Sequence, residues 1–243
     1  MAKKPTKPPM RTDDKAVAPS SDSDIDAFLS QVRSRPASQN GNAQGRLVFA
    51  MDATMSRQPT WDRACHLQAE MFAETAKIGG LSVQLVYFRG FRECRASRWV
   101  DKADTLAELM AQVDCRGGHT QIGRVLSHLK KEAKKKKVNA AIYVGDCMEE
   151  DIDSLCEAAG ELGLLGVPLF LFQEGHDPVA ERSFREIARL TNGAYCRFDA
   201  NSAQQLRALL SAVAVYAAGG RKALGDLSGD AKQAAQLLLE QLN

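Results

Sequence analysis

Apolar residues along this chain gather into short continuous runs separated by longer stretches with helical spacing. The runs occupy residues 46–52, 81–88, 138–145, 167–172 and 194–198. Runs of this length with no regular polar alternation are typical of strands buried on both faces, as in a parallel sheet. The sequence therefore predicts five strands of that kind.

A sixth segment, residues 94–100, has polar residues at alternate positions and follows the strand at 81–88 after a tight Arg89–Gly90 connection. This pattern predicts an antiparallel hairpin at the edge of the sheet. Amphipathic spacing predicts helices at 59–77, 102–113, 120–136, 150–164, 178–190 and 202–218. Strands that alternate with helices of this length predict an α/β fold: a doubly wound, mostly parallel six-stranded sheet with helices on both faces.

The composition shifts at both ends of the predicted domain, which spans residues 46–218. Residues 1–22 are basic and rich in Pro and Ser, which is typical of disorder. Residues 23–45 combine a short amphipathic helix with a polar linker, and residues 219–243 combine a glycine-rich linker with an amphipathic helix. Packing onto the domain is the simpler interpretation of the first helix, whereas for the second helix packing and partner binding are equally open.

The 243 residues, 44% of them hydrophobic, suffice for one sizeable domain with tails. A net charge of +2 gives no general attraction to nucleic acid. The six cysteines form no CxxC pair and show no zinc spacing with histidine, which favours a reducing compartment without disulfides. The basic N-terminus precedes no apolar segment, and no apolar run reaches the ~18 residues of a membrane span. We therefore expect a cytoplasmic protein.

The strongest local charge is the run Lys130–Lys137, which has six lysines and one glutamate at the end of a predicted helix. Cations are favourable at a helix C-terminus, so a solvated helix end explains the run. The alternative is a surface for an acidic partner or nucleic acid. The first interpretation is favoured because no aromatic residues that would stack on bases interrupt the run.

Oxygen-bearing side chains follow two of the buried strands. The strand at 46–52 ends in Asp52, and Thr54 and Ser56 follow at alternate positions; Asp146 follows the strand at 138–145, and Thr120 follows a glycine pair. Ligands of open α/β sheets bind beyond the carboxyl ends of the strands. Hydroxyls and carboxylates suit Mg²⁺, Mn²⁺ or Ca²⁺ rather than zinc. Taken singly, Ser56 and Thr120 could each be a helix cap.

Together these five residues resemble the metal-ion-dependent adhesion site of von Willebrand factor type A (vWA) domains. The family's Asp-x-Ser-x-Ser motif, often with Thr in the middle, is matched by the segment 52–56 (DATMS). Its Thr after a glycine pair is matched within 117–123 (GGHTQIG), and its Asp after the fourth strand is matched by Asp146. The resemblance covers roughly residues 45–218 and implies a Rossmann-like fold.

The resemblance also implies a role for each ligand. Thr54 and Ser56 would bind the metal directly, Asp52 and Asp146 would act largely through water, and Thr120 would join or leave with conformation. With only two carboxylates the ion stays electrophilic and can accept a carboxylate from another molecule. The prediction is a non-enzymatic adaptor or scaffold domain that captures an Asp or Glu of a protein partner; intracellular members of the family often work beside ring-forming ATPases.

Three neighbouring residues are candidates for contact with the partner. Arg57 could steer an acidic partner or simply face solvent. His119 lies in the site loop, where a solvated histidine is the simpler interpretation. Glu149 could contact a partner, although acids at a helix N-terminus are expected from the helix dipole alone.

The alternative function is a haloacid-dehalogenase-like, Mg²⁺-dependent phosphatase with Asp52 as the nucleophile. Gly145-Asp146 and Asp151 imitate its second motif. Thr54 stands where those enzymes carry an acid/base Asp, and no lysine has a clear place at a strand end. A scaffold with an inactive metal site is a third possibility. The sequence contains no phosphate-binding GxxxxGK[ST] motif and no GxSxG motif of a serine hydrolase.

Overall fold

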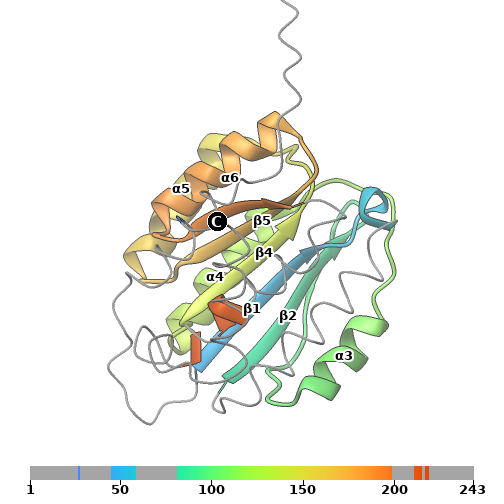
Figure 1. The fold of residues 1–243 in the computed structure, drawn as a ribbon, viewed down its shortest axis with the longest axis vertical. Helices are drawn as coiled ribbons and strands as arrows, with labels where there is room; N and C mark the ends of the chain where they lie inside the picture. The colour runs from blue at the N-terminus through green and yellow to red at the C-terminus, as the bar shows by residue number, and fades with distance from the viewer. Residues whose placement is uncertain (1–26, 28–44, 59–80, 199–210, 215–216, 219–243) are drawn as a thin grey trace, which may run out of the picture.

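The computed structural model describes residues 27, 45–58, 81–198, 211–214 and 217–218. Its centre is a six-stranded sheet with the strand order β3-β2-β1-β4-β5-β6 (Figure 1). The strands are β1 (Gly45–Asp52), β2 (Leu81–Arg89), β3 (Glu93–Ala96), β4 (Ala140–Gly145), β5 (Leu169–Glu174) and β6 (Ala194–Phe198). All neighbouring pairs are parallel except β2 and β3. The predicted fold class, including the antiparallel edge strand, is confirmed.

The helices alternate with the strands as predicted. They are η1 (Met55–Arg57), a single 3-10 turn, followed by α3 (Ala103–Ala111), α4 (Ile122–Lys135), α5 (Ile152–Leu164) and α6 (Pro178–Leu190). The bounds of α6 and β6 are those predicted from the sequence. The edge strand ends earlier than predicted, at Ala96. Beyond it the chain contacts β2 through a hydrogen bond from the Ser97 N–H to the Leu85 carbonyl at 2.8 Å and through a bridge between Val83 and Val100.

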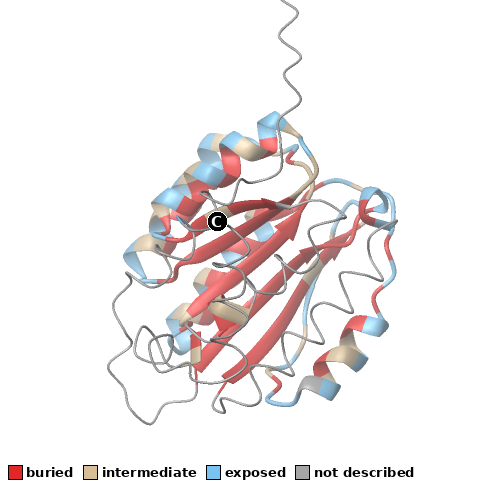
Figure 2. Cartoon of the chain, in the orientation of Figure 1, coloured by how far each residue is buried: buried red, intermediate tan, exposed pale blue. Residues whose placement is uncertain are grey.

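The central strand β1 is buried along its whole length, which explains its uninterrupted apolar run (Figure 2). Alternate side chains point to opposite faces. Leu47 and Phe49 pack in one core with α3 and the helical residues 211–214 and 217–218. Val48 packs in the other core with α4, α5 and α6. A strand covered on both faces needs apolar residues along its interior, and β1 has them from Leu47 to Met51.

Several predictions lie outside the described residues: the disordered tail at 1–22, the segment 23–45 except for residue 27 and Gly45, the helix at 59–77 and the segment 219–243. Of the predicted helix at 202–218, residues 211–214 and 217–218 are described and are helical. None of the described helices has the length and apolar character needed to cross a membrane.

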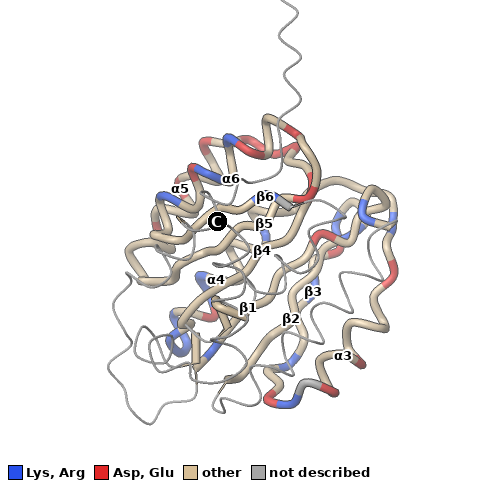
Figure 3. The backbone as a smooth tube through the Cα atoms, viewed as in Figure 1, with Lys and Arg blue, Asp and Glu red and all other residues tan. Residues whose placement is uncertain are grey.

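The lysine run lies at the C-terminal end of α4. This end of the helix is near the amino ends of the strands, on the side of the sheet away from their carboxyl ends (Figure 3). Lys130 pairs with Glu161 at 2.9 Å and Lys135 with Glu132 at 2.7 Å, and residues 134–137 are exposed. This arrangement agrees with a solvated helix end. Glu132, the one acid in the run, is instead buried.

The five described cysteines form no disulfide: Cys94, Cys115, Cys147, Cys156 and Cys196.

Candidate metal site at the carboxyl ends of β1 and β4

Asp52 and Asp146 follow neighbouring strands at the point where the topology of the sheet reverses. The chain leaves β1 toward β2 on one side, while β4 pairs with β1 on the other. At such a switch point the loops above two adjacent strands diverge and leave a crevice, where doubly wound folds bind their ligands. Asp52 is the last residue of β1, and Asp146 comes directly after β4.

The Asp52 side chain is fully buried, yet only half of its carboxylate is bonded. Oδ1 accepts a hydrogen bond from the Thr54 backbone N–H at 2.7 Å. Oδ2 has no hydrogen-bond partner among the described residues. Burial raises the pKa of Asp52 to about 6, with hydrogen bonds from Thr54 acting in the opposite direction and the charge of Asp146 adding to the rise. A buried carboxylate oxygen without a hydrogen-bond partner costs folding free energy unless a ligand supplies the missing partner.

The hydroxyls of Thr54 and Ser56, in the segment that follows Asp52, lie close together. Thr54 Oγ1 and Ser56 Oγ are 3.0 Å apart, with Thr54 buried and Ser56 exposed. Thr54 is the N-cap of η1 but makes no side-chain cap bond, so capping does not account for it. The site thus presents one hydroxyl from inside and one from the solvent side.

Asp146 and Cys147 complete a compact cluster with Asp52. One ligand atom from each of the three side chains lies within 4.8 Å of the other two. Asp146 Oδ1 is a second buried oxygen without a hydrogen-bond partner among the described residues. Burial, reinforced by the neighbouring carboxylates, raises the pKa of the Cys147 thiol well above its ordinary value. Three potential ligands therefore converge, two of them through orphaned oxygens.

Thr120 is held against the loop that follows Asp146. The Thr120 hydroxyl accepts a hydrogen bond from the Glu149 N–H at 3.1 Å, and the Thr120 N–H donates to Glu149 Oε2 at 3.0 Å. His119 Nδ1 lies 3.2 Å from the same carboxylate oxygen, and both side chains are exposed. Thr120 does not cap α4, because the first N–H groups of that helix donate to Glu150. The Thr120 hydroxyl is therefore part of a contact between its own loop and the loop that follows Asp146.

A tight backbone contact positions the loop that carries Thr120. Gly118 lies so close to Gly90 that a Cβ at position 118 would stand 2.0 Å from the Gly90 carbonyl oxygen. Only glycine permits this approach. The Gln121 amide donates to the Arg89 and Gly90 carbonyls at 3.2 and 3.1 Å. Gly118 therefore serves the packing of two loops, whereas a Cβ at Gly117 would meet open space.

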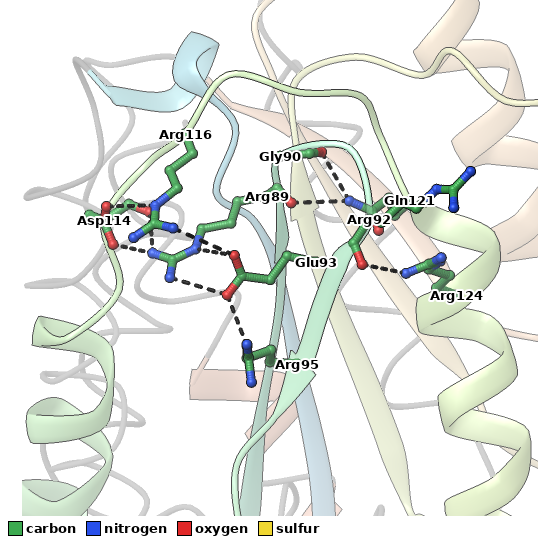
Figure 4. A network of polar contacts seen from close by, with 9 residues as sticks. All are labelled: Arg89, Gly90, Arg92, Glu93, Arg95, Asp114, Arg116, Gln121 and Arg124. Carbon is green, nitrogen blue, oxygen red and sulfur yellow. Dashed lines mark hydrogen bonds and ion pairs between the residues drawn. The ribbon is translucent and has the colours of Figure 1, made fainter.

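The start of the same loop is fixed by a network of ion pairs (Figure 4). Arg89, buried at the end of β2, pairs with Asp114 and with Glu93, the latter at 3.1 Å. Arg116 pairs with Asp114 at 3.0 Å, and its backbone N–H donates to the Ala53 carbonyl at 3.0 Å. This last bond joins the loop directly to the DATMS segment, so the two motif-bearing loops are held in one unit.

The predicted roles of Arg57 are wrong. Its side chain is about 1% exposed and forms an ion pair with Glu174 at the end of β5. Arg57 therefore neither faces solvent nor offers its charge to a partner. The physical reason is that η1 turns the arginine inward, where the carboxylate of a neighbouring strand compensates its charge.

Sequence reasoning missed two further residues of the site. The spacing of the six cysteines gives Cys147 no role, although its position directly after Asp146 is a signal that it lies at the strand end. Tyr143 is wholly buried in β4, and its hydroxyl has no hydrogen-bond partner among the described residues. A Cβ on Gly145 would lie 2.6 Å from that hydroxyl, so Gly145 makes room for it.

The donor set fits a divalent cation. Two buried carboxylate oxygens lack partners, and two hydroxyls lie beside them. Oxygen ligands of this kind, completed by water, are those that Mg²⁺ and Mn²⁺ take. A bound cation would also favour the charged form of Asp52 and lower its raised pKa.

Comparisons with known proteins bear on the fold. No family model matches the sequence, and no curated protein matches it. Among solved structures, a von Willebrand factor type A protein from Catenulispora acidiphila is similar with a TM-score of 0.57 and 17% identity. The match covers 70% of this chain and 42% of that one. This chain has the von Willebrand factor type A fold.

Two more solved structures are similar to this chain. The SpRpn10 VWA domain is similar with a TM-score of 0.55 and 9% identity, over 65% of this chain and 89% of that one. The pilus adhesin SpaC from Lactobacillus rhamnosus GG matches with a TM-score of 0.57 and 10% identity, over 74% of this chain and 31% of that one. The present chain thus matches less than half of the Catenulispora protein and of the adhesin.

Proposed function

We propose that this chain is a vWA protein-interaction domain that binds one divalent cation, Mg²⁺ or Mn²⁺, and uses it to capture an acidic side chain of a partner protein. The metal ligands are Asp52, Thr54, Ser56, Thr120 and Asp146. The observation that carries the proposal is a pair of buried oxygens, Asp52 Oδ2 and Asp146 Oδ1, at the switch point of the sheet, which have no hydrogen-bond partner in the described part of the chain.

Each ligand has a distinct part in this proposal. The bound cation supplies a Lewis acid that can accept a carboxylate oxygen from outside the chain. Thr54 and Ser56 hold the ion from the side of η1, while Asp52 and Asp146 hold it, directly or through water, from the strand ends. Thr120 would be the ligand whose binding depends on conformation, since its hydroxyl accepts a hydrogen bond from the Glu149 N–H in this structure. Only two carboxylates surround the cation, so a partner carboxylate is still attracted.

The similar structures support an interaction role. One is named as a VWA domain of Rpn10 and another as a pilus adhesin. A cytoplasmic location and a ring-forming ATPase as partner remain predictions from the resemblance. His119 and Glu149, which are exposed beside Thr120, are proposed to border the partner's side chain.

The phosphatase alternative gains no support from the geometry. Its lysine at a strand end has no counterpart, since the described parallel strands end in Asp52, Arg89, Gly145, Glu174 and Phe198. We propose that the domain is not an enzyme.

A peptide array tests the proposal. Peptides with a central Asp or Glu are compared with versions carrying Asn or Gln, in Mg²⁺ and in EDTA. The expected result is retention of a subset of acidic peptides in Mg²⁺, with loss in EDTA and on the amide versions.

Thr120→Ala is expected to lose this binding, whereas the matched control Ser127→Ala, at an exposed position on α4, is expected to keep it. Binding that is equal in EDTA, or equal for amide and acid, would contradict the proposal.

A further inference from the structure

We propose that Cys147 is an additional metal ligand and that the site also takes Zn²⁺, bound through Asp52, Asp146 and the Cys147 sulfur. This inference rests on the proposed metal site and extends the class of metals it binds. It differs from the set of oxygen ligands described above, because the new ligand is a thiol.

The geometry places the sulfur beside the carboxyl groups of Asp52 and Asp146. One ligand atom each from Asp52, Asp146 and Cys147 lies within 4.8 Å of the other two. Ligands of a tetrahedral zinc ion lie roughly 3–4 Å from one another, given Zn–O and Zn–S bonds of about 2.0 and 2.3 Å. Asp146 and Cys147 are both half-buried, and zinc binding requires their ligand atoms to move closer together than the upper limit of 4.8 Å.

A second observation points to a ligand at the same place. Asp52 is fully buried, and its Oδ2 has no hydrogen-bond partner among the described residues. The same holds for Oδ1 of Asp146. Two empty carboxylate oxygens beside a thiol are unfavourable for folding, and a cation satisfies all three groups at once.

Cys147 also differs from the other described cysteines in its surroundings. Cys115 and Cys196 belong to the apolar core on one face of the sheet, and Cys94 packs against the core on the other. Cys147 and Cys156 belong to neither core, but of the described cysteines only Cys147 groups with two carboxyl groups, those of Asp52 and Asp146. Apolar packing, the ordinary reason for a buried cysteine, does not explain its position.

The chemistry of the three ligands selects the metal. Mg²⁺ takes hard oxygen ligands, whereas a thiolate favours Zn²⁺ or Co²⁺. On binding, the Cys147 thiol releases its proton to solvent and its sulfur bonds to the metal, without any change of oxidation state. The cluster thus offers oxygens for Mg²⁺ and a mixed set for Zn²⁺ within one pocket.

Co²⁺ as a spectroscopic probe for Zn²⁺ tests the inference on the full chain. Wild type is expected to show the near-ultraviolet charge-transfer band of a Co²⁺–thiolate bond, and Zn²⁺ is expected to abolish it by displacement. Cys147→Ser is expected to lack the band and to bind Zn²⁺ roughly 10–100-fold more weakly, at least the loss seen when a ligand-orienting group is removed. The matched control Cys156→Ser, half-buried on α5, is expected to keep both.

Wild-type protein offers an independent measurement that needs no folded variant. Zn²⁺, but not Mg²⁺ at equal occupancy, is expected to slow alkylation of Cys147 by iodoacetamide, as mapped by mass spectrometry. A Co²⁺ band that persists in Cys147→Ser, or alkylation that Zn²⁺ leaves unchanged, would overturn the inference.

The two proposals fail in different ways. Binding of Mg²⁺ by wild type without a Co²⁺–thiolate band would overturn the role of Cys147 and leave the proposed function standing. Failure of wild type to bind Mg²⁺ or Mn²⁺ would overturn the proposed function, whatever Co²⁺ shows.

Discussion

Two buried polar clusters lie at opposite ends of β1, and they differ in whether their groups find partners within the chain. At the amino end, Arg46 pairs with Glu132 of α4 at 3.0 Å. At the carboxyl end, Asp52 faces Asp146 with one oxygen of each left without a partner among the described residues. One strand thus has a satisfied polar network at its amino end. At its carboxyl end it has a polar cluster that is only partly satisfied by the described residues.

The amino-end cluster is bonded on every side. Glu132 Oε2 accepts from Arg46 and, at 2.9 Å, from the indole N–H of Trp99. The guanidinium of Arg46 lies 3.7 Å from the centre of the Trp99 ring and also donates to the Lys136 carbonyl at 2.6 Å. This cluster joins α4, β1 and the segment before α3 into one unit.

The two clusters shift the pKa of their carboxyl groups in opposite directions. Burial alone would raise the pKa of Glu132, but hydrogen bonds from Lys135 and Trp99 hold it below its ordinary value. Burial raises the pKa of Asp52 to about 6, and its hydrogen bonds from Thr54 do not offset that rise. The comparison teaches that a satisfied buried carboxylate supports the fold, whereas an unsatisfied one marks a place for a ligand.

The largest expected effect comes from breaking the satisfied cluster. Glu132→Ala leaves the guanidinium of Arg46 and the indole N–H of Trp99 buried without their partner. Removal of one member of a buried ion pair destabilises by about 3–5 kcal/mol. Urea denaturation measures the loss, and Glu157→Ala, at an exposed position on α5, is expected to change stability by less than about 0.5 kcal/mol. Equal midpoints for the two variants would contradict a structural role.

The opposite result is expected at the unsatisfied cluster. In EDTA, Asp52→Asn is predicted to be more stable than wild type above pH 6. The folded pKa of about 6 lies above the ordinary 3.8, so the folded state binds more protons between these values and wild type loses stability as pH rises through them. The difference reaches about 3 kcal/mol near pH 8, at about 1.36 kcal/mol per pKa unit, and vanishes near pH 4. A variant less stable than wild type at pH 8 would show that the charge of Asp52 is satisfied within the fold.

The smallest expected effect comes from removing the hydroxyl groups of two tyrosines, one without and one with a hydrogen-bond partner. The Tyr143 hydroxyl is buried without a partner among the described residues, whereas the Tyr195 hydroxyl donates to Gln173 at 2.7 Å. Tyr143→Phe is expected to raise the free energy of unfolding by about 1 kcal/mol, and Tyr195→Phe to lower it by about the same amount. Chemical denaturation of the pair in EDTA measures both changes. Losses of equal size would mean that the Tyr143 hydroxyl is bonded.

Much of the fold could be predicted from the sequence because its signals are local. The apolar runs of β1, β2, β4, β5 and β6 reflect burial on both faces, and the amphipathic spacing of α4 and α6 reflects burial on one. The position of the edge strand was predicted, but its end was not. The strand ends at Ala96, although Ser97 and Val100 still bond to β2, and the alternation of polar residues does not show where regular pairing stops.

The candidate site could be predicted only in part. Asp52, Thr54, Ser56, Thr120 and Asp146 stand at strand ends and loop starts, where position alone indicates a role, and their metal binding remains a proposal. Arg57 could not be placed because its partner, Glu174, lies 117 residues further along the chain. Its burial depends on the tertiary arrangement of η1 against β5.

The central claim is that a divalent cation binds the carboxyl groups of Asp52 and Asp146 and satisfies their unpartnered oxygens. Thermal melting with and without Mg²⁺ or Mn²⁺, on wild type, Asp52→Asn and Thr120→Ala, tests this most directly. Ligand at about 100 times its dissociation constant adds about 2.7 kcal/mol. For a chain of this size that predicts a rise of roughly 5–10 °C in wild type, absent in Asp52→Asn and reduced in Thr120→Ala. A melting temperature that neither metal changes, or a rise that both variants retain in full, would contradict the account.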